Sequence, residues 1–243
     1  MKPVAIVPTY NERDNIDTLI ADVLALPVDV SVIVVDDNSP DGTGQTAEEW
    51  AARDGRVQVI HRAGKLGLGT AYVAGFRHAL ANGFDRIMTM DADFSHHPRY
   101  IPAMIDLSRE CDLVIGSRYV TGGGTLHCSL KRRALSRGAN AFARLTLGLR
   151  ASDCTAGFRC YRREVFASID LDTIFSDGYS FLIEMLYRVQ REGWTIGEAP
   201  IVFEDRRFGA SKISRQEVYR AMVTVLRLSA GHLRDRLGER RHA

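Results

Sequence analysis

Two carboxylates, Asp91 and Asp93, stand one residue apart directly after a short apolar run from Ile87 to Met90. The run is long enough for one buried strand. In an open α/β sheet, ligands bind outside the carboxyl ends of the strands. Two acids at such an edge can share one divalent cation, because Mg²⁺ is held by one or two carboxylates together with substrate phosphates. The stretch therefore predicts a metal–diphosphate site, and a solvated acidic turn is the alternative interpretation.

Strand and helix patterns alternate around this stretch and predict an α/β fold. The expected strands are apolar and rich in β-branched residues, as buried parallel strands are. They are Val4–Val7, Val30–Val35, Val57–Ile60, Ile87–Met90 and Leu113–Ile115. Apolar residues at helical spacing predict helices over 15–26, from a cap at Thr43 to Arg53, from Gly69 to Asn82, and over 98–111. This alternation implies a mostly parallel sheet with helices on both faces.

Two other folds share this order of elements. A dinucleotide-binding Rossmann fold needs glycines in the first strand–helix turn, and that turn here is Pro8-Thr-Tyr-Asn-Glu12. A phospho-receiver domain carries its acidic pair after the first strand, whereas Asp36 and Asp37 follow the second expected strand. Both folds are disfavoured, and a non-catalytic nucleotide-sugar-binding module remains as the alternative of another class.

The composition is ordinary for a soluble domain, with 243 residues of which 45% are hydrophobic and 26% charged. The charge is uneven: residues 1–125 carry 11 Lys/Arg and 17 Asp/Glu (net −6), and residues 126–243 carry 21 and 13 (net +8). An acidic half suited to metal thus precedes a basic half suited to anions, a pattern that suggests a nucleic-acid or membrane partner. No apolar run approaches the ~18 residues of a membrane span, and the N-terminus has no signal-peptide pattern. We therefore expect a cytoplasmic location.

Several motifs, taken in order, resemble those of inverting family 2 glycosyltransferases with the GT-A fold. They are Pro8-Thr-Tyr-Asn-Glu12, Val35-Asp-Asp-Asn-Ser-Pro-Asp-Gly42, Gly67-Leu-Gly-Thr-Ala71, Met90-Asp-Ala-Asp93 and Gly116-Ser-Arg-Tyr119. Three later motifs are similar to those of the dolichol-phosphate (polyprenol-phosphate) mannose synthases. They are Lys131-Arg-Arg-Ala-Leu-Ser-Arg-Gly-Ala-Asn140, Asp153-Cys-Thr-Ala-Gly-Phe-Arg159 and Phe203-Glu-Asp-Arg-Arg-Phe-Gly-Ala-Ser-Lys212.

The resemblance implies a nucleoside-diphosphate-sugar donor and assigns residues to it. The positions that match the family's donor site are Pro8, Tyr10, Glu12, Asp37, Asp91, Ala92, Asp93, Arg206 and Lys212. Asp91 and Asp93 match the DxD motif and are expected to act in catalysis by holding Mg²⁺ or Mn²⁺, which would neutralise the leaving diphosphate. Ser95 stands where some relatives have Gln, which argues against residue 95 as a metal ligand.

Basic residues on both sides of the boundary at residue 125 are expected to bind the acceptor. Arg118 (which we also expect to act in catalysis), Arg132 and Ser136 are the residues predicted to hold an acceptor phosphate, since an Arg guanidinium binds phosphate through two donors. Residues 126–152 contain no acid, and for Arg144 and Arg150 in this segment a solvated helix face is the preferred interpretation. A phosphate monoester is mostly a dianion at neutral pH. It is already a nucleophile, so no side-chain base is expected.

The implied reaction is inverting transfer of mannose from GDP-mannose to a polyprenyl (dolichyl-type) monophosphate. A different donor such as UDP-glucose, or a saccharide acceptor, is left open. We expect a GT-A domain over residues 1–212 and a basic amphipathic helix over residues 213–243, which either packs on its own domain or lies in a membrane interface. Contact with the cytoplasmic face of a membrane would then be peripheral or through a membrane-anchored partner protein. No nucleic-acid partner is expected.

Overall fold

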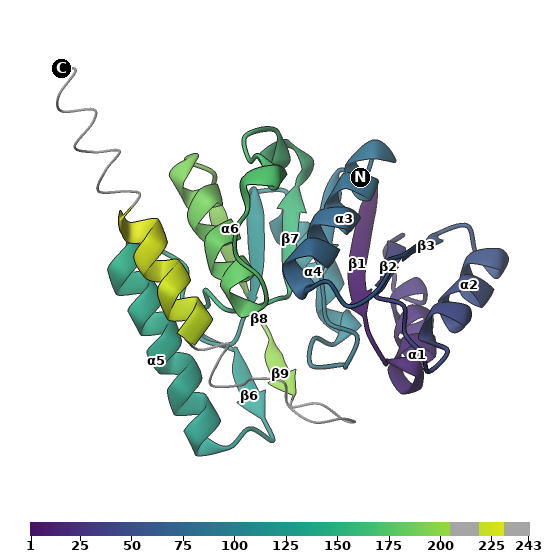
Figure 1. The fold of residues 1–243 in the computed structure, drawn as a ribbon, viewed down its shortest axis with the longest axis horizontal. Coiled ribbons are helices and arrows are strands. Elements are labelled where there is room, and N and C mark those ends of the chain that lie inside the picture. Colours follow the sequence, from purple (N-terminus) through teal and green to yellow (C-terminus); the bar gives the residue numbers. More distant parts are fainter. Residues whose placement is uncertain (205–218, 231–243) are drawn as a thin grey trace.

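The computed structural model describes residues 1–204 and 219–230, and its centre is one mixed sheet (Figure 1). The strands lie in the order β3-β2-β1-β4-β7-β5-β8. Their bounds are β1 Pro3–Thr9, β2 Ser31–Asp36, β3 Val57–His61, β4 Arg86–Thr89, β5 Leu113–Ser117, β7 Arg159–Arg162 and β8 Ile196–Pro200. Every neighbouring pair is parallel except that β7 runs antiparallel to β4 and β5. The predicted mostly parallel sheet is confirmed.

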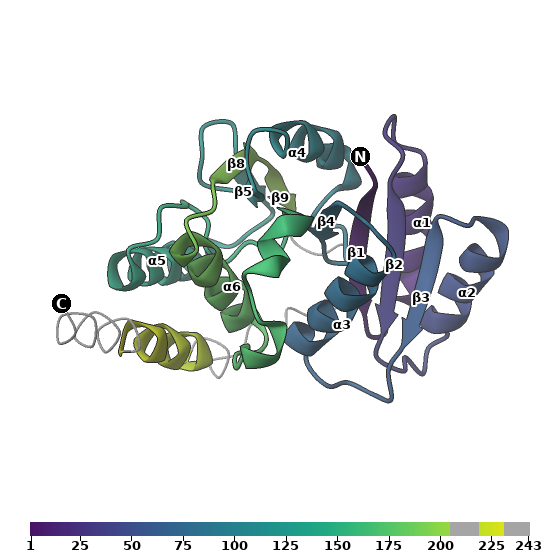
Figure 2. The same cartoon turned by 90° about the horizontal axis from the view of Figure 1, so that it is seen from above.

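Alternate residues of the strands face two separate hydrophobic clusters, as the two-residue period of a strand requires. Val4 and Ile6 of β1 pack with α3 (Leu68–Ala81) and α6 (Tyr179–Arg191). Ala5 and Val7 of the same strand pack with α1 (Arg13–Leu24), α2 (Thr43–Arg53) and α4 (Ile101–Leu107). Figure 2 shows these helices on opposite faces of the sheet. The sheet is therefore covered on both faces, and its strand ends remain for a site.

Beyond the main sheet lie a small second sheet and two helices. A small second sheet pairs β6 (Gly124–Leu126) with β9 (Val202–Glu204). The 18-residue helix α5 spans Leu130–Leu147, and residues 219–230 form a second helix, called the C-terminal helix below. Figure 1 shows the C-terminal helix, in yellow, beside α5, and residues of both belong to one hydrophobic cluster. Short 3₁₀ turns cover Pro98–Tyr100, Arg163–Ala167 and Leu171–Thr173.

Two helix predictions need correction. The helix expected over 98–111 begins as a 3₁₀ turn and ends at Leu107, because the Ser108 hydroxyl turns back to the Ile105 carbonyl (2.6 Å). Thr43 is the first residue of α2 and not its cap, which is Gly42 with φ +92°. The Asp41 carboxylate accepts both the Thr43 N–H (3.0 Å) and its hydroxyl (2.6 Å), so Asp41 supplies the cap.

The C-terminal helix departs from the single apolar stripe that its sequence suggests. Val225 and Leu228 are buried, whereas Met222 and Leu226 are exposed. Its inner side packs on the domain and its outer side carries apolar residues to the surface. Residues 205–218 lie outside the described residues, so the predicted boundary at 212/213 is not placed. Among the helices of the described residues, none has the length and hydrophobicity needed to cross a membrane.

Gly67 should resist substitution. Its φ of +102° and ψ of 152° lie in a region that only glycine adopts readily, and a Cβ would collide with the Asp177 carboxylate. We expect Gly67→Ala to lower the free energy of unfolding by about 1–3 kcal/mol. Gly55→Ala is the control, because a Cβ there meets nothing within 4 Å. Equal thermal denaturation of the two variants would contradict this account.

Candidate active site

The predicted site residues follow strands whose carboxyl ends meet at one edge of the sheet. β1, β2 and β4 run parallel, and β5 points the same way because β7 opposes both β4 and β5. Backbone hydrogen bonds tie the residues that directly follow β2 and β4 to β1. The Asp37 N–H donates to the Thr9 carbonyl (3.0 Å), and the Met90 N–H donates to the Ile6 carbonyl (3.1 Å). The segments after the strands are therefore fixed beside one another.

One cavity of about 1160 Å³ lies at this edge and collects every predicted site residue that the structure describes. Its lining includes Pro8, Tyr10, Glu12, Asp37, Asp91, Ala92, Asp93, Arg118, Arg132 and Ser136. These positions span 129 residues of chain from Pro8 to Ser136, counted inclusively. Arg206 and Lys212 lie outside the described residues. The fold thus brings the expected donor residues and acceptor residues to a single hollow.

Strained backbone marks the loops at this edge. Asn11, Asn38 and Phe94 have φ values of +59°, +58° and +59°, a region that residues other than glycine seldom adopt. Asn11 follows β1, Asn38 follows β2, and Phe94 directly follows Asp93. A bulky aromatic residue in this conformation persists only where its surroundings hold it, which is common at ligand-binding sites.

The Asp91–Asp93 segment is held by hydrogen bonds from its own loop and from two rings. The buried Asp93 carboxylate accepts the Ser95 N–H (3.1 Å) and its hydroxyl (2.6 Å). The Asp91 N–H donates to His96 Nδ1 (3.3 Å), and the Tyr72 hydroxyl lies 3.4 Å from the Asp91 carboxylate. Burial, together with the charge of Asp91, raises the pKa of Tyr72, so this phenol stays protonated and can donate.

The donor set at this segment fits a hard divalent cation. Asp91 and Asp93 offer carboxylate oxygens, the ligands that Mg²⁺ and Mn²⁺ prefer. Among the described residues, no group of three or more His, Cys, Asp or Glu is placed to hold a metal. In proteins, one or two carboxylates that hold Mg²⁺ are usually completed by water and substrate phosphate.

Two cations that were not predicted lie beside Asp37 and Tyr10, two of the expected donor residues. Arg62 Nη1 lies 2.8 Å from Asp37 Oδ1, with both side chains largely buried. Lys65 Nζ lies over the Tyr10 ring, 4.6 Å from its centroid. Burial raises the pKa of Asp37, and the nearby Arg62 charge offsets only part of that rise. Arg62 therefore helps Asp37 to remain an acceptor for hydrogen bonds from a ligand.

Removing Arg62 should move the pH dependence of donor use. Without the guanidinium, the charged form of Asp37 loses its counter-ion, so the pKa of Asp37 rises further. We expect the acid limb of a plot of donor kcat/KM against pH to shift to higher pH in Arg62→Ala and by less in Arg62→Lys. Arg77→Ala, which alters an exposed cation on α3, is the control. An unmoved acid limb in Arg62→Ala would contradict the coupling.

On another part of the cavity wall, Arg118 is paired with Asp153. Arg118 Nε and Nη2 donate to the two Asp153 oxygens (both 2.7 Å), and Nη2 also donates to Thr155 Oγ1 (2.8 Å). The Arg118 N–H adds a bond of 3.1 Å to the same carboxylate. Among the described residues, Nη1 donates no hydrogen bond. The pair therefore fixes the orientation of Arg118 and leaves one donor nitrogen for a ligand.

The electrostatics of this pair favour the charged forms. Burial raises the pKa of Asp153, but hydrogen bonds and charge from Arg118 outweigh it and hold the pKa below its ordinary value. Asp153 is fully buried, and Arg118 is 13% exposed. Asp153 is thus an ionised partner of Arg118 and is poorly suited to accept a proton during catalysis.

Helix α5 brings Arg132 and Ser136 to the wall of the same cavity. The Tyr119 hydroxyl donates to Ser136 Oγ (2.8 Å), which leaves the Ser136 hydroxyl hydrogen for another acceptor. The cavity also has apolar lining residues, which are Leu135, Phe142, Leu182, Ile183, Met222 and Val225. One cavity thus combines carboxylates, cations and an apolar wall.

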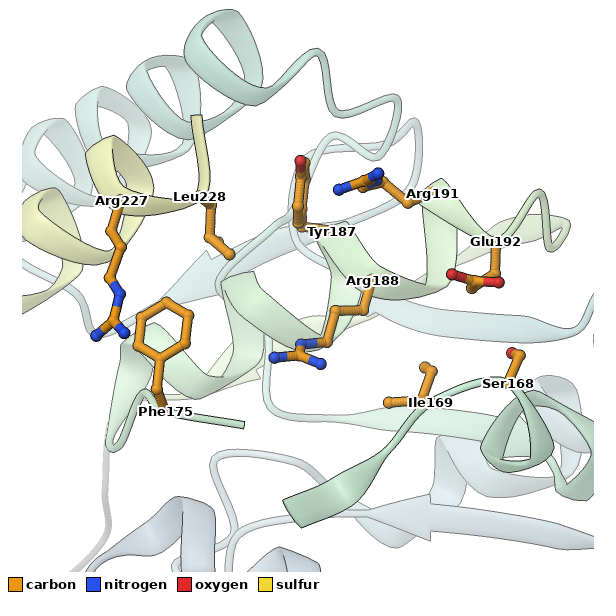
Figure 3. Close-up of a pocket in the computed structure, with 9 residues that line it drawn as sticks. All are labelled: Ser168, Ile169, Phe175, Tyr187, Arg188, Arg191, Glu192, Arg227 and Leu228. Carbon is orange, nitrogen blue, oxygen red and sulfur yellow. The ribbon is translucent and has the colours of Figure 1, made fainter. Parts of the chain in front are cut away.

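A second cavity, of about 430 Å³, shares no lining residue with the first (Figure 3). It lies between α6, the C-terminal helix and the segment around Phe175. Arg188 on its wall is already paired with Glu184 (2.6 Å), and Arg227 lies over the Phe175 ring at 4.0 Å. None of the predicted site residues that the structure describes contributes to it.

One known protein family matches most of this chain. Residues 4–170 match the family described as glycosyl transferase family 2. The chain therefore belongs to glycosyl transferase family 2 and is a glycosyltransferase.

Two curated relatives cover nearly the whole chain. An undecaprenyl-phosphate mannosyltransferase of Micrococcus luteus is 43% identical over 242 residues, which are 98% of this chain and 100% of the relative. A polyprenol monophosphomannose synthase of Mycolicibacterium smegmatis is 43% identical over 226 residues, 92% of this chain and 85% of the relative. The resemblance to polyprenol-phosphate mannose synthases is confirmed.

Solved structures establish the fold. Mannosyl-3-phosphoglycerate synthase from Rubrobacter xylanophilus has a TM-score of 0.69 at 19% identity, covering 97% of this chain and 75% of that one. Glucosyl-3-phosphoglycerate synthase from Mycobacterium tuberculosis, in complex with Mn²⁺, UDP and glucosyl-3-phosphoglycerate, has a TM-score of 0.63 at 21% identity. The match covers 93% of this chain and 78% of that one. The predicted GT-A fold is confirmed.

Proposed function

We propose that the protein transfers mannose from GDP-mannose to a polyprenyl monophosphate with inversion. The observation that carries this proposal is one cavity whose wall combines the carboxylates of Asp91 and Asp93, the cations Arg118 and Arg132, and apolar side chains. A nucleotide sugar needs the first part, a phosphate needs the second, and an isoprenoid chain needs the third. The names of the two 43% identical relatives support the same acceptor and sugar.

The donor would lie beside the carboxylates of the cavity wall. Tyr10 and Pro8 offer surfaces for the base, and Glu12 and Asp37 offer acceptors for its N–H groups and for ribose hydroxyls. Asp91 and Asp93 would hold Mg²⁺ or Mn²⁺, which neutralises the charge that develops on the leaving diphosphate. The Mn²⁺ in the Mycobacterium tuberculosis neighbour is consistent with a divalent ion in this fold. Arg206 and Lys212 are proposed to contact the donor as well.

The acceptor phosphate would lie between Arg118, Arg132 and Ser136. Two guanidinium groups and a hydroxyl can bind its oxygens while one oxygen attacks the anomeric carbon of the sugar. The phosphate arrives as a dianion, so no protein base is needed. The ion pair of Asp153 with Arg118 supports this view, because it removes a nearby carboxylate from the role of base.

Peripheral contact with the cytoplasmic face of a membrane would deliver the lipid. Exposed apolar side chains, including Leu130 (80% exposed), Leu145 (86%) and Leu226 (55%), lie on α5 and the C-terminal helix among Lys and Arg residues. Each Lys or Arg near an anionic surface contributes about 1 kcal/mol. A membrane-anchored partner protein is the other possible route to the membrane.

Vesicle binding tests the peripheral contact. We expect the protein to sediment with vesicles that contain anionic phosphatidylglycerol, and to be released when salt shortens the Debye length. The variant Leu145→Glu/Leu226→Glu should bind less, because each exposed leucine is replaced by an acid. Equal sedimentation of both proteins with anionic and neutral vesicles would contradict this role.

A panel of substrates tests the reaction. The protein is supplied with GDP-mannose or UDP-glucose, and with a polyprenyl phosphate, the matching polyprenol or a soluble saccharide. The proposal predicts product only from GDP-mannose with polyprenyl phosphate. If UDP-glucose is the one donor that gives product, the proposed sugar is wrong. If the saccharide is the one acceptor that gives product, the proposed lipid acceptor is wrong. No turnover with any pair would favour a non-catalytic binding module.

A further inference from the structure

Helix α5 is attached to the domain in an unusual way. It is 18 residues long, yet only Asn140 and Ala143 on it are buried. A helix on the surface of a globular domain normally buries a broad apolar stripe. Here the centre of the buried contact is a polar side chain, since Asn140 is 3% exposed. The position of α5 on the domain therefore depends on how that amide is held.

The hydrogen bonds of Asn140 reach both α5 and a distant loop. Its Nδ2 donates to the Ser136 carbonyl (2.9 Å) and to Thr155 Oγ1 (3.1 Å). Its Oδ1 accepts the Cys154 N–H (2.6 Å). Both donor hydrogens and the carbonyl are therefore used. A buried amide satisfied in this way tolerates little displacement, because each lost bond leaves a desolvated polar group.

These bonds connect the proposed acceptor residues. Arg132, Ser136 and Asn140 are four residues apart and lie on one face of α5. Thr155, which accepts from Asn140, also accepts from Arg118 Nη2 (2.8 Å). Asn140 thus links α5, which carries Arg132 and Ser136, to the loop that holds Arg118. It does not itself line the cavity.

We infer that Asn140 is a positioning residue for the acceptor phosphate. It fixes the position of α5 along its axis and its rotation about that axis, so that Arg132 and Ser136 face the same phosphate as Arg118. This inference rests on the proposed function. A displacement of about 1 Å at reacting groups can cost about a hundredfold in rate. A misplaced α5 would therefore raise the KM for the acceptor. Donor use should be spared, because the hydrogen bonds of Asn140 within residues 1–204 go to Ser136, Cys154 and Thr155 and to none of the expected donor residues there.

The test compares Asn140→Leu with wild-type protein, using GDP-mannose, Mg²⁺ and a short-chain polyprenyl phosphate. Leucine preserves the volume and removes all three hydrogen bonds. We expect the acceptor KM to rise about tenfold or more, with the donor KM within about twofold of wild type. Asn82→Leu, which alters an exposed amide at the end of α3, is the control and should change neither constant.

Further variants separate positioning from plain stability. Asn140→Asp keeps the acceptor for the Cys154 N–H and loses both donors, so it should also raise the acceptor KM, and thermal denaturation measures its loss of stability separately. The effect of Asn140→Leu should shrink in a Ser136→Ala background, because the two residues act on one phosphate.

The outcomes are distinct. Transfer by wild type with an unchanged acceptor KM in Asn140→Leu and Asn140→Asp overturns this inference alone. An equal rise of both KM values also overturns it, since that marks general damage. A wild-type protein that transfers nothing to polyprenyl phosphate removes the proposed function, and this inference with it.

Discussion

Asp93→Asn should lower kcat for sugar transfer by roughly a thousandfold, the upper end of what loss of one charge-stabilising group costs. The carboxylate is buried beside Asp91, and its charge is what would hold a divalent cation against the leaving diphosphate. Asparagine retains an oxygen that can accept from Ser95, so the loop should keep its shape. The loss should therefore appear in turnover and not in the melting temperature. Steady-state kinetics and thermal denaturation measure the two.

The control for this variant is Asp29→Asn, which removes a carboxylate whose side chain is 87% exposed. It should have wild-type kinetics. A higher Mg²⁺ concentration should restore little activity to Asp93→Asn, because the missing ligand is also the missing charge. Activity of Asp93→Asn within threefold of wild type would remove Asp93 from the metal site.

Asp153→Asn should destabilise the folded protein strongly. Removing one partner of a buried ion pair leaves the other charge without compensation, which costs about 3–5 kcal/mol. The amide would also point N–H groups toward the Arg118 donors that the carboxylate now accepts. We expect a melting temperature lower by roughly 10 °C. Acceptor use should also fall, because Arg118 would lose its fixed orientation.

Asp106→Asn is the matched control, because Asp106 pairs with Arg109 at 3.6 Å on the surface. Exposed pairs contribute about 0–1 kcal/mol, so its stability should stay close to wild type. A similar small loss in Asp153→Asn would show that the buried pair is not a stabilising element.

The same pair predicts a pH dependence of stability. The pKa of Asp153 is lower in the folded state than the ordinary value of 3.8. Its stabilising contribution is therefore present above 3.8 and is lost as the pH falls through the folded-state pKa. The difference in unfolding free energy between wild type and Asp153→Asn should shrink in that acidic range. A difference that stays constant down to the acid transition would contradict the assignment.

The N-terminal half of the fold was predictable because its strands are continuous apolar runs. The run predicted over Val30–Val35 is β2, shifted by one residue, and the other four predicted strands lie within three residues of their bounds. β7, β8 and α6 were not predicted. β7 begins with Arg159, which reads as a surface residue but is fully buried, with its guanidinium donating to the carbonyls of Cys154, Ala156 and Leu182. The Leu182 carbonyl lies 23 residues away in the sequence, and a local pattern cannot reveal a partner at that separation.

The site shows the same limit. Its motif residues were identifiable because their types and order resemble a family, and the fold brings them to one cavity. The residues that position them were not identified. Arg62 pairs with Asp37, Thr155 with Arg118, and Asn140 with the Cys154–Thr155 loop. Asn140 and Thr155 lie inside motifs that resemble the family, and Arg62 lies in none of the motifs. The spacing of residues in the sequence does not mark these contacts, because each joins segments that only the folded chain brings together.

The most direct test of the central claim is transfer of labelled mannose from GDP-mannose into organic-extractable lipid, with Mg²⁺ present or chelated. We expect label in the lipid phase only when both polyprenyl phosphate and the divalent ion are present, and none with Asp93→Asn. Equal labelling after chelation, or labelling by Asp93→Asn at the wild-type rate, would contradict a metal–diphosphate site at Asp91 and Asp93.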